Sequence, residues 1–140
     1  MTSNLDPLVS SILDFWFGEL DQDGASSSEK SSRWFKKDPE FDSSINRIYG
    51  SYLETAAMGA YDRWTSSIEG SAALIVLLDQ FSRNIFRGEA KAWIFDPKAL
   101  SITLMLLERG DILKAPAAYA YFMLLPTMYN TDIKWIYYEL

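Results

Sequence analysis

The sequence predicts an all-α fold, and three observations support this prediction. Three Asp-Pro pairs each precede a stretch in which apolar residues recur at helical intervals. Aspartate accepts hydrogen bonds from the amides at a helix start, and proline suits the first helical position because its missing amide would have no partner there. Gly18, Gly59 and Gly110 follow the periodic stretches, as glycines at helix ends do. No stretch alternates at the period of a strand, so we expect little or no sheet. The pairs are Asp6-Pro7, Asp38-Pro39 and Asp96-Pro97.

Five helices are expected in order along the chain. The Asp-Pro pairs start the first, second and fourth helices, and Pro126 closes the short fifth helix, because proline cannot continue the hydrogen-bond ladder. The second has the clearest amphipathic pattern. The third is apolar all round between Ala72 and Leu78, which places it at the centre of a bundle. The expected helices cover residues 7–17, 39–59, 68–81, 97–109 and 116–125.

One stretch between the first two expected helices is strongly polar. Residues 21–32 are almost all polar, and we expect a mobile loop there. Helices joined by short turns are mostly antiparallel neighbours. A chain of 140 residues suits one hydrophobic core. We therefore expect antiparallel helix hairpins in a single domain that covers residues 1–140.

The composition excludes several classes of function. The chain has no histidine and no cysteine, which removes Ser-His-Asp triads, cysteine nucleophiles, thiolate metal sites and disulfides. Its net charge of -6 opposes nucleic-acid binding. The seven glycines are too scattered for a phosphate-binding loop. We expect no metal, no cofactor and no nucleic-acid partner.

The hydrophobic segments are short. The longest purely aliphatic stretch, Ala72 to Leu78, falls far below the roughly 18–20 residues that a bilayer-crossing helix needs. The N-terminal residues show neither a secretory nor a transit pattern. We expect no membrane association and a cytoplasmic location.

Polar residues interrupt the most hydrophobic part of the chain, between Leu77 and Gly88. Burying such groups is costly unless they form hydrogen bonds, so they should satisfy one another or face a cleft. Their spacing of four residues places several of them on one helical face. We name them the polar motif, and they are the candidate ligand-binding residues. The polar motif consists of Asp79, Gln80, Arg83, Asn84 and Arg87.

The polar motif has two interpretations, and the sequence leaves both open. In the structural one, Asp79 and Arg83 form a partly buried ion pair, while Asn84 and Arg87 bind carbonyls at a helix end. In the functional one, Arg83 and Arg87 bind a carboxylate or phosphate while Asp79 orients one of them. The aromatic clusters at residues 15–17 and 34–35 are more typical of a core than of a ligand cleft.

Four segments in order resemble the bacterial family called domain of unknown function 924. The most specific is Asp-Gln-Phe-x-Arg-Asn-x-Phe-Arg-Gly, in which this chain has Ser82 where the family usually has proline. The resemblance covers roughly residues 8–133 and implies a fold similar to tetratricopeptide-repeat proteins. The family usually continues Leu-Pro with Met-His-Ser-Glu, where this chain has Met128-Tyr129-Asn130-Thr131. The segments are 13–18, 34–42, 78–88 and 96–100.

The resemblance also concerns the C-terminal region, because family members usually continue for several dozen residues beyond this point. The last eight residues, 133–140, are unusually apolar. We expect a homo-oligomer in which Trp135, Ile136 and Tyr138 of one chain help to cover an apolar surface of another. That surface is expected to include Leu106, Tyr121 or Leu125.

Three interpretations of the function follow, and one of them is a purely structural protein whose polar motif only closes the core. The leading hypothesis is a helical scaffold or binding module that presents a groove to a peptide or small anionic ligand, because the usual catalytic groups are missing. The alternative is a hydrolase-like enzyme that uses carboxylate and arginine chemistry around Asp79 and Arg83. A raised carboxylate pKa in a closed pocket would favour the enzyme, and an open groove would favour the binding module.

Overall fold

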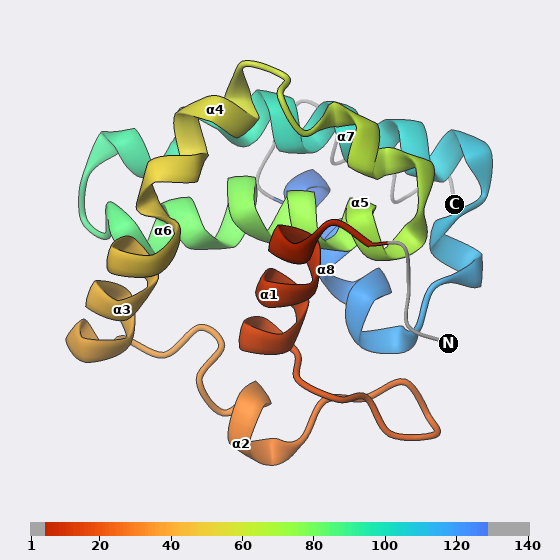
Figure 1. The fold of residues 1–140 in the computed structure, drawn as a ribbon, viewed down its shortest axis with the longest axis horizontal. Coiled ribbons are helices and arrows are strands. Elements are labelled where there is room, and N and C mark those ends of the chain that lie inside the picture. The colour runs from red at the N-terminus through yellow and green to blue at the C-terminus, as the bar shows by residue number, and fades with distance from the viewer. Residues whose placement is uncertain (1–4, 129–140) are drawn as a thin grey trace.

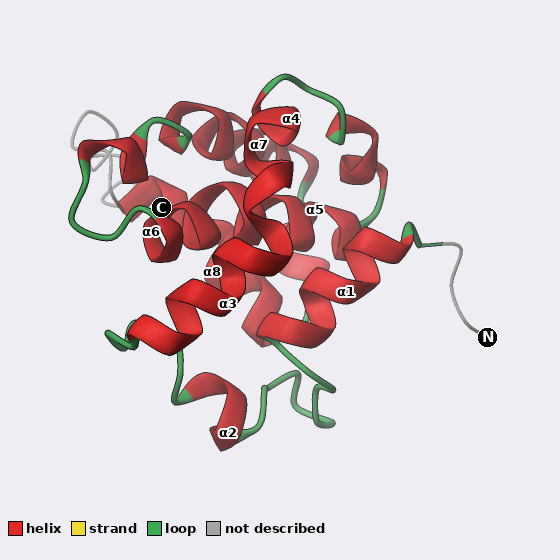
Figure 2. Cartoon of the chain, turned by 60° about the vertical axis from the view of Figure 1, so that its left-hand side comes forward, coloured by secondary structure: helices red, strands yellow, loops and turns green. Residues whose placement is uncertain are grey.

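The computed structural model describes residues 5–128 and confirms an all-α fold in this part of the chain (Figure 1, Figure 2). Short 3-10 helices lie between several of the α-helices, and the segment η3 (Val76–Phe81) is a π-helix. The α-helices are α1 (Pro7–Trp16), α2 (Ser28–Ser31), α3 (Pro39–Tyr49), α4 (Leu53–Ala57), α5 (Ile68–Ile75), α6 (Ser82–Ile85), α7 (Asp96–Arg109) and α8 (Ala117–Met128). The 3-10 helices are η1 (Gly50–Tyr52), η2 (Asp62–Ser66), η4 (Ala90–Trp93) and η5 (Ile112–Lys114).

A continuous helical run at the centre organises the fold. It consists of α5, η3 and α6, and it crosses the middle of the molecule in Figure 1. Helix α5 contacts α1, α7 and α8. Every residue from Ala72 to Leu78 is fully buried. The apolar stretch that predicted a central helix therefore lies in the core, as expected.

The aspartates of the first two Asp-Pro pairs cap helices as predicted. The aspartate of the third pair does not cap its helix. Asp6 accepts a hydrogen bond from the amide of Leu8, and Asp38 accepts from those of Glu40 and Phe41. Asp96 is itself the first residue of α7, and its side chain makes no capping bond. Its carboxylate instead binds the guanidinium of Arg83, because a paired, charge-assisted bond is stronger than a bond to an amide.

The second predicted helix is interrupted. Helix α3 ends at Tyr49, and the 3-10 turn η1 precedes α4. Glycine is a weak helix former, and Gly50 stands at this junction. The expected helix end near Gly59 is confirmed, because α4 ends at Ala57 and Gly59 has the positive φ that is common just after a helix. Gly18 and Gly110 have the same conformation.

The fifth predicted helix is longer than expected. Helix α8 continues through Pro126 to Met128, so the prediction that Pro126 closes the helix is wrong. Proline removes one ladder bond, but Leu125, Pro126 and Thr127 are all buried. Packing of this last turn against the core compensates for the missing bond.

The polar loop at residues 21–32 contains the single-turn helix α2. The carboxylate of Asp21 accepts hydrogen bonds from the amides of Asp23 and Ala25, each at 2.9 Å. The amide of Ala118 donates to the carbonyl of Gly24 at 2.9 Å. The loop is thereby attached to the start of α8, and its mobility stays a prediction.

Candidate functional site

Asp79 and Gln80 of the polar motif lie on η3, Arg83 and Asn84 lie on α6, and Arg87 lies in the turn after α6. Asp79 is completely buried, and Gln80 is nearly so. One carboxylate oxygen of Asp79 accepts from Nε2 of Gln80 at 2.8 Å, and the other accepts from Nη1 of Arg83 at 2.8 Å. The predicted pairing of Asp79 with Arg83 is therefore present.

Arg83 binds a second carboxylate that the sequence interpretation did not connect with it. Its Nη1 and Nη2 atoms donate to the two oxygens of Asp96 at 3.1 and 2.9 Å. Such a two-pronged geometry is the strong form of an arginine–carboxylate pair. The guanidinium thus lies between Asp79, on its own helical run, and Asp96, at the start of α7.

Asp42 on α3 binds the remaining two polar residues of the motif. Asn84 donates from Nδ2 to Oδ1 of Asp42 at 2.8 Å. Arg87 donates from Nε to Oδ2 at 2.7 Å and from Nη2 to Oδ1 at 3.2 Å. The sequence predicted helix-end carbonyls as partners for Asn84 and Arg87, and the structure shows a side-chain carboxylate instead.

The charges of the polar motif are balanced from within the protein. Arg83 binds two carboxylates, Arg87 binds one, and each pair contains at least one largely buried side chain. Hydrogen bonding to Asp42 raises the pKa of Arg87. An anion pocket would direct both guanidinium groups toward a ligand, whereas here Arg83 joins α6 to α7, and Arg87 joins the turn after α6 to α3.

Two carbonyls of the π-helical turn η3 accept hydrogen bonds from side chains that follow it. A π-turn widens the helix and leaves carbonyls without their usual partners, and such turns are frequent at functional sites. The hydroxyl of Ser82 donates to the carbonyls of Leu78 and Asp79 at 2.7 and 3.1 Å, and Arg83 donates to the carbonyl of Asp79 at 2.8 Å. Ser82 therefore satisfies backbone groups of this turn.

Burial raises the pKa of Asp79 from 3.8 to about 6, although Arg83 and Gln80 favour the charged form. The folded protein therefore holds this proton more tightly than the unfolded chain does. The resulting contribution to stability is complete below about pH 4 and is lost as the pH rises through about 6. A shift of this size corresponds to roughly 2–3 kcal/mol.

We predict that Asp79→Asn removes this pH dependence. In the native chain, the free energy of unfolding should fall by roughly 2–3 kcal/mol between pH 4 and pH 7 relative to the variant, because only the native side chain titrates there. Urea denaturation of both proteins at several pH values measures the difference. Parallel stability curves for the two proteins would contradict the prediction.

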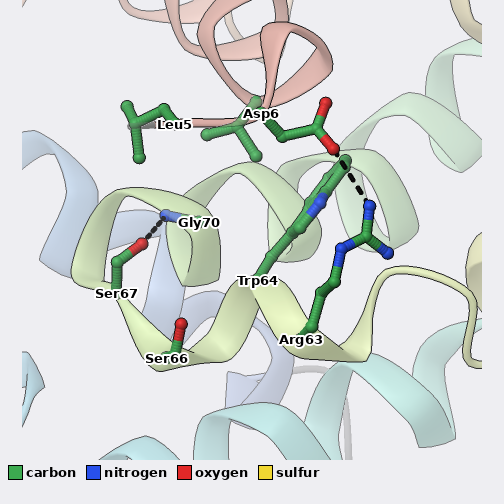
Figure 3. A pocket seen from close by; sticks show the side chains of 8 residues that line it. Leu5, Asp6, Arg63, Trp64, Ser66, Ser67 and Gly70 are labelled. Carbon is green, nitrogen blue, oxygen red and sulfur yellow. Dashed lines mark hydrogen bonds and ion pairs between the residues drawn. The ribbon is translucent and has the colours of Figure 1, made fainter. Parts of the chain in front are cut away.

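A separate concavity lies between α1 and the start of α5, and we name it the α1–α5 cleft (Figure 3). Its volume is about 580 Å³, within the range typical of small-molecule sites. Leu5 and Val9 supply apolar lining from the α1 side, and Trp64 supplies it from η2. The cleft is lined by Leu5, Asp6, Val9, Arg63, Trp64, Ser66, Ser67 and Gly70.

Polar groups line the α1–α5 cleft in two places: Asp6 and Arg63 lie on one side of Trp64, and Ser66 and Ser67 lie on the other (Figure 3). Arg63 donates from Nη2 to Oδ2 of Asp6 at 3.1 Å, and Figure 3 shows this pair beside the ring of Trp64. The side chain of Arg63 is 65% exposed. The indole Nε1 of Trp64 is buried without a hydrogen-bond partner. Ser67 caps α5 by accepting from the amide of Gly70 at 2.9 Å.

The sequence interpretation did not identify the cleft. Asp6 indicated only a helix start, and Arg63 lies 57 residues further along the chain. A signal was nevertheless present, since Ser66 and Ser67 precede an apolar helix and serine is a preferred capping residue. No pattern in the sequence linked that cap to the start of α1.

Metal sites and membrane spans are both absent from residues 5–128. In that range, no group of three or more acidic side chains is placed to hold a metal ion. Within the same part of the chain, no helix is long and apolar enough to cross a membrane.

The fold and the buried polar motif define a helical protein whose central run is tied to its neighbours by ion pairs. The chain belongs to the DUF924 family, described as bacterial proteins of unknown function, whose model matches residues 12–136. This match confirms the resemblance found in the sequence.

One solved structure is similar along most of the chain. It is a protein of unknown function from Agrobacterium tumefaciens, ATU0120, with 32% sequence identity and a TM-score of 0.77. The similarity covers 90% of this chain and 66% of the other, so this chain spans slightly less than two thirds of that protein. No curated protein matches the sequence significantly.

Proposed function

We propose that the protein is a helical binding module whose α1–α5 cleft takes a small carboxylate-bearing ligand or the carboxylate end of a peptide. The main support is that one concavity of about 580 Å³ is lined by the exposed guanidinium of Arg63, by the serines Ser66 and Ser67, and by apolar side chains. Mostly apolar walls with a few convergent polar groups are typical of small-ligand sites.

The geometry of Arg63 favours a carboxylate. A guanidinium has five N–H donors in a planar fork, and Arg63 uses two of its nitrogens in bonds to the carbonyl of Ala60 and to Asp6. Asp6 balances part of this charge, but the side chain of Arg63 is 65% exposed, whereas those of Arg83 and Arg87 are only 20% and 35% exposed. The remaining N–H groups of Arg63 can therefore reach a ligand carboxylate, with which a guanidinium pairs well. Leu5, Val9 and Trp64 suit an apolar group attached to that carboxylate.

The enzyme alternative depends on the raised pKa of Asp79. A catalytic acid has to come within hydrogen-bond reach of its substrate. Asp79 is completely buried, and both of its carboxylate oxygens already accept hydrogen bonds. This observation favours a binding module over a hydrolase centred on Asp79 and Arg83.

Calorimetric titration with 3-phenylpropionate tests the proposal. We predict saturable binding that is at least about tenfold tighter than that of 3-phenylpropionamide, because the amide lacks the charge that Arg63 recognises. Arg63→Ala should weaken binding of the carboxylate by a similar factor.

Arg47→Ala is the matched control, because Arg47 is exposed on α3 and does not line the cleft. It removes the same charge and should leave the affinity unchanged. Equal binding of acid and amide, or equal losses in the two arginine variants, would contradict the proposal. Absence of binding to the native chain would also contradict it.

A further inference from the structure

Helix α8 has the composition of an interior helix. Its sequence, AAYAYFMLLPTM, contains no charged residue. A helix that is apolar all round normally lies in a core. Phe122 and Met123 are indeed fully buried, but Tyr121 is 51% exposed and Met128 is 56% exposed. One side of an interior-type helix therefore faces solvent in the described part of the chain.

Phe35 extends this exposed surface. Its side chain is 59% exposed. Its ring stacks on Phe122 with 5.7 Å between ring centroids and meets Tyr121 edge-on at 6.2 Å. Phe35 is also a bulky residue with a positive φ of 63°, a conformation that persists only where surrounding structure maintains it. We name Phe35, Tyr121 and Met128 the α8 surface.

The chain itself continues from this surface. Residues 129–140 lie outside the described residues, and they include Ile133, Trp135, Ile136 and Leu140. The family model matches as far as residue 136, so the family pattern does not end with α8. A segment of this composition gains free energy by leaving water.

The segment is long enough to return over α8. Tyr121 lies seven residues before Met128, which is about 10 Å along a helix. The twelve residues after Met128 span up to about 40 Å when extended. Since the segment is attached beside the surface, its effective concentration there is far higher than that of a separate chain.

We propose that residues 129–140 pack against the α8 surface of their own chain. The inference is independent of the α1–α5 cleft. Two of the residues expected to contact a second copy, Leu106 and Leu125, are already buried within one chain, whereas Tyr121 is exposed. Packing within the chain covers the exposed residues without requiring a partner.

Cysteine cross-linking tests this proposal cleanly, because the chain has no cysteine. Tyr121→Cys is combined in turn with single cysteines at Ile133, Trp135, Ile136 and Tyr138, and the proteins are oxidised at low concentration. We expect at least one pair to form an intramolecular disulfide in more than half of the molecules. Electrophoresis without reductant separates this product from a linked dimer.

Met58→Cys, paired with the same four positions, is the matched control. Met58 is 87% exposed and therefore open to cross-linking, but it lies at the end of α4 and not on the α8 surface. A segment that packs on the α8 surface should therefore give no intramolecular product with it. Phe35→Cys serves as a second anchor if Tyr121→Cys disturbs the helical circular dichroism spectrum. Linked dimers in place of the intramolecular product would overturn the proposal in favour of a second copy. Equal cross-linking to residues 58 and 121 would also overturn it.

Discussion

Arg83→Ala is expected to lower the free energy of unfolding by about 3–5 kcal/mol at neutral pH. The change removes the shared cation of two carboxylates and leaves Asp79 in a fully buried position without its charged partner. Arg83→Lys should recover only part of the loss, because an ammonium group cannot hold both carboxylates with a planar fork. Urea denaturation followed by circular dichroism measures the three proteins.

A double-mutant cycle with Asp79→Asn separates the pair from general damage to the fold. Because the two side chains are in direct contact at 2.8 Å, the double variant should lose less stability than the sum of the two single variants. We expect a coupling of at least about 1 kcal/mol. Additive losses within about 0.3–0.5 kcal/mol would show that the contact contributes nothing specific. Arg47→Ala, an exposed arginine, should change stability by less than about 0.5 kcal/mol.

The sequence could predict those parts of the fold that depend on neighbouring residues. The starts at Asp6 and Asp38 depend on amides two or three residues away. The glycine ends at Gly18 and Gly110 depend on a local backbone conformation. Such signals are contained in a short stretch of sequence, and the structure agrees with them.

The predictions failed where distant contacts compete with local ones. Asp96 had the same local signal as Asp38, but a guanidinium 13 residues earlier in the chain binds its carboxylate more strongly than an amide would. Pro126 had a local signal for a helix end, and burial of the last turn of α8 outweighs it. Sequence spacing cannot rank a local bond against a tertiary contact that it does not reveal.

In the polar motif, too, the local contact was predictable from the sequence and the distant contacts were not. The pairing of Asp79 with Arg83 follows from a spacing of four residues on one helix. The carboxylate of Asp42 is 42 residues from Asn84 and 45 from Arg87, so only the packing of α3 against α6 brings it there. The π-turn that positions Asp79 also lies outside the reach of a pattern based on the α-helical period.

Gly70→Ala is expected to destabilise the protein by about 3 kcal/mol, near the upper end of the usual cost of overpacking. A methyl group on Gly70 would overlap the carbonyl oxygen of Trp64. That oxygen belongs to the backbone of η2 and accepts from the amide of Ser67, so it cannot turn aside as a flexible side chain can. The clash should exceed the roughly 1 kcal/mol by which alanine is normally preferred in a helix.

Gly50→Ala is the matched control. A methyl group there would meet the amide side chain of Asn46, which is exposed and has room to rotate. Its stability should change by less than about 1 kcal/mol, and urea denaturation of both variants measures the contrast. Because Gly70 and Trp64 both line the α1–α5 cleft, Gly70→Ala should also weaken binding of 3-phenylpropionate. Equal stability of the two variants would mean that η2 shifts on α5 at little cost. The α1–α5 cleft would then not be preformed.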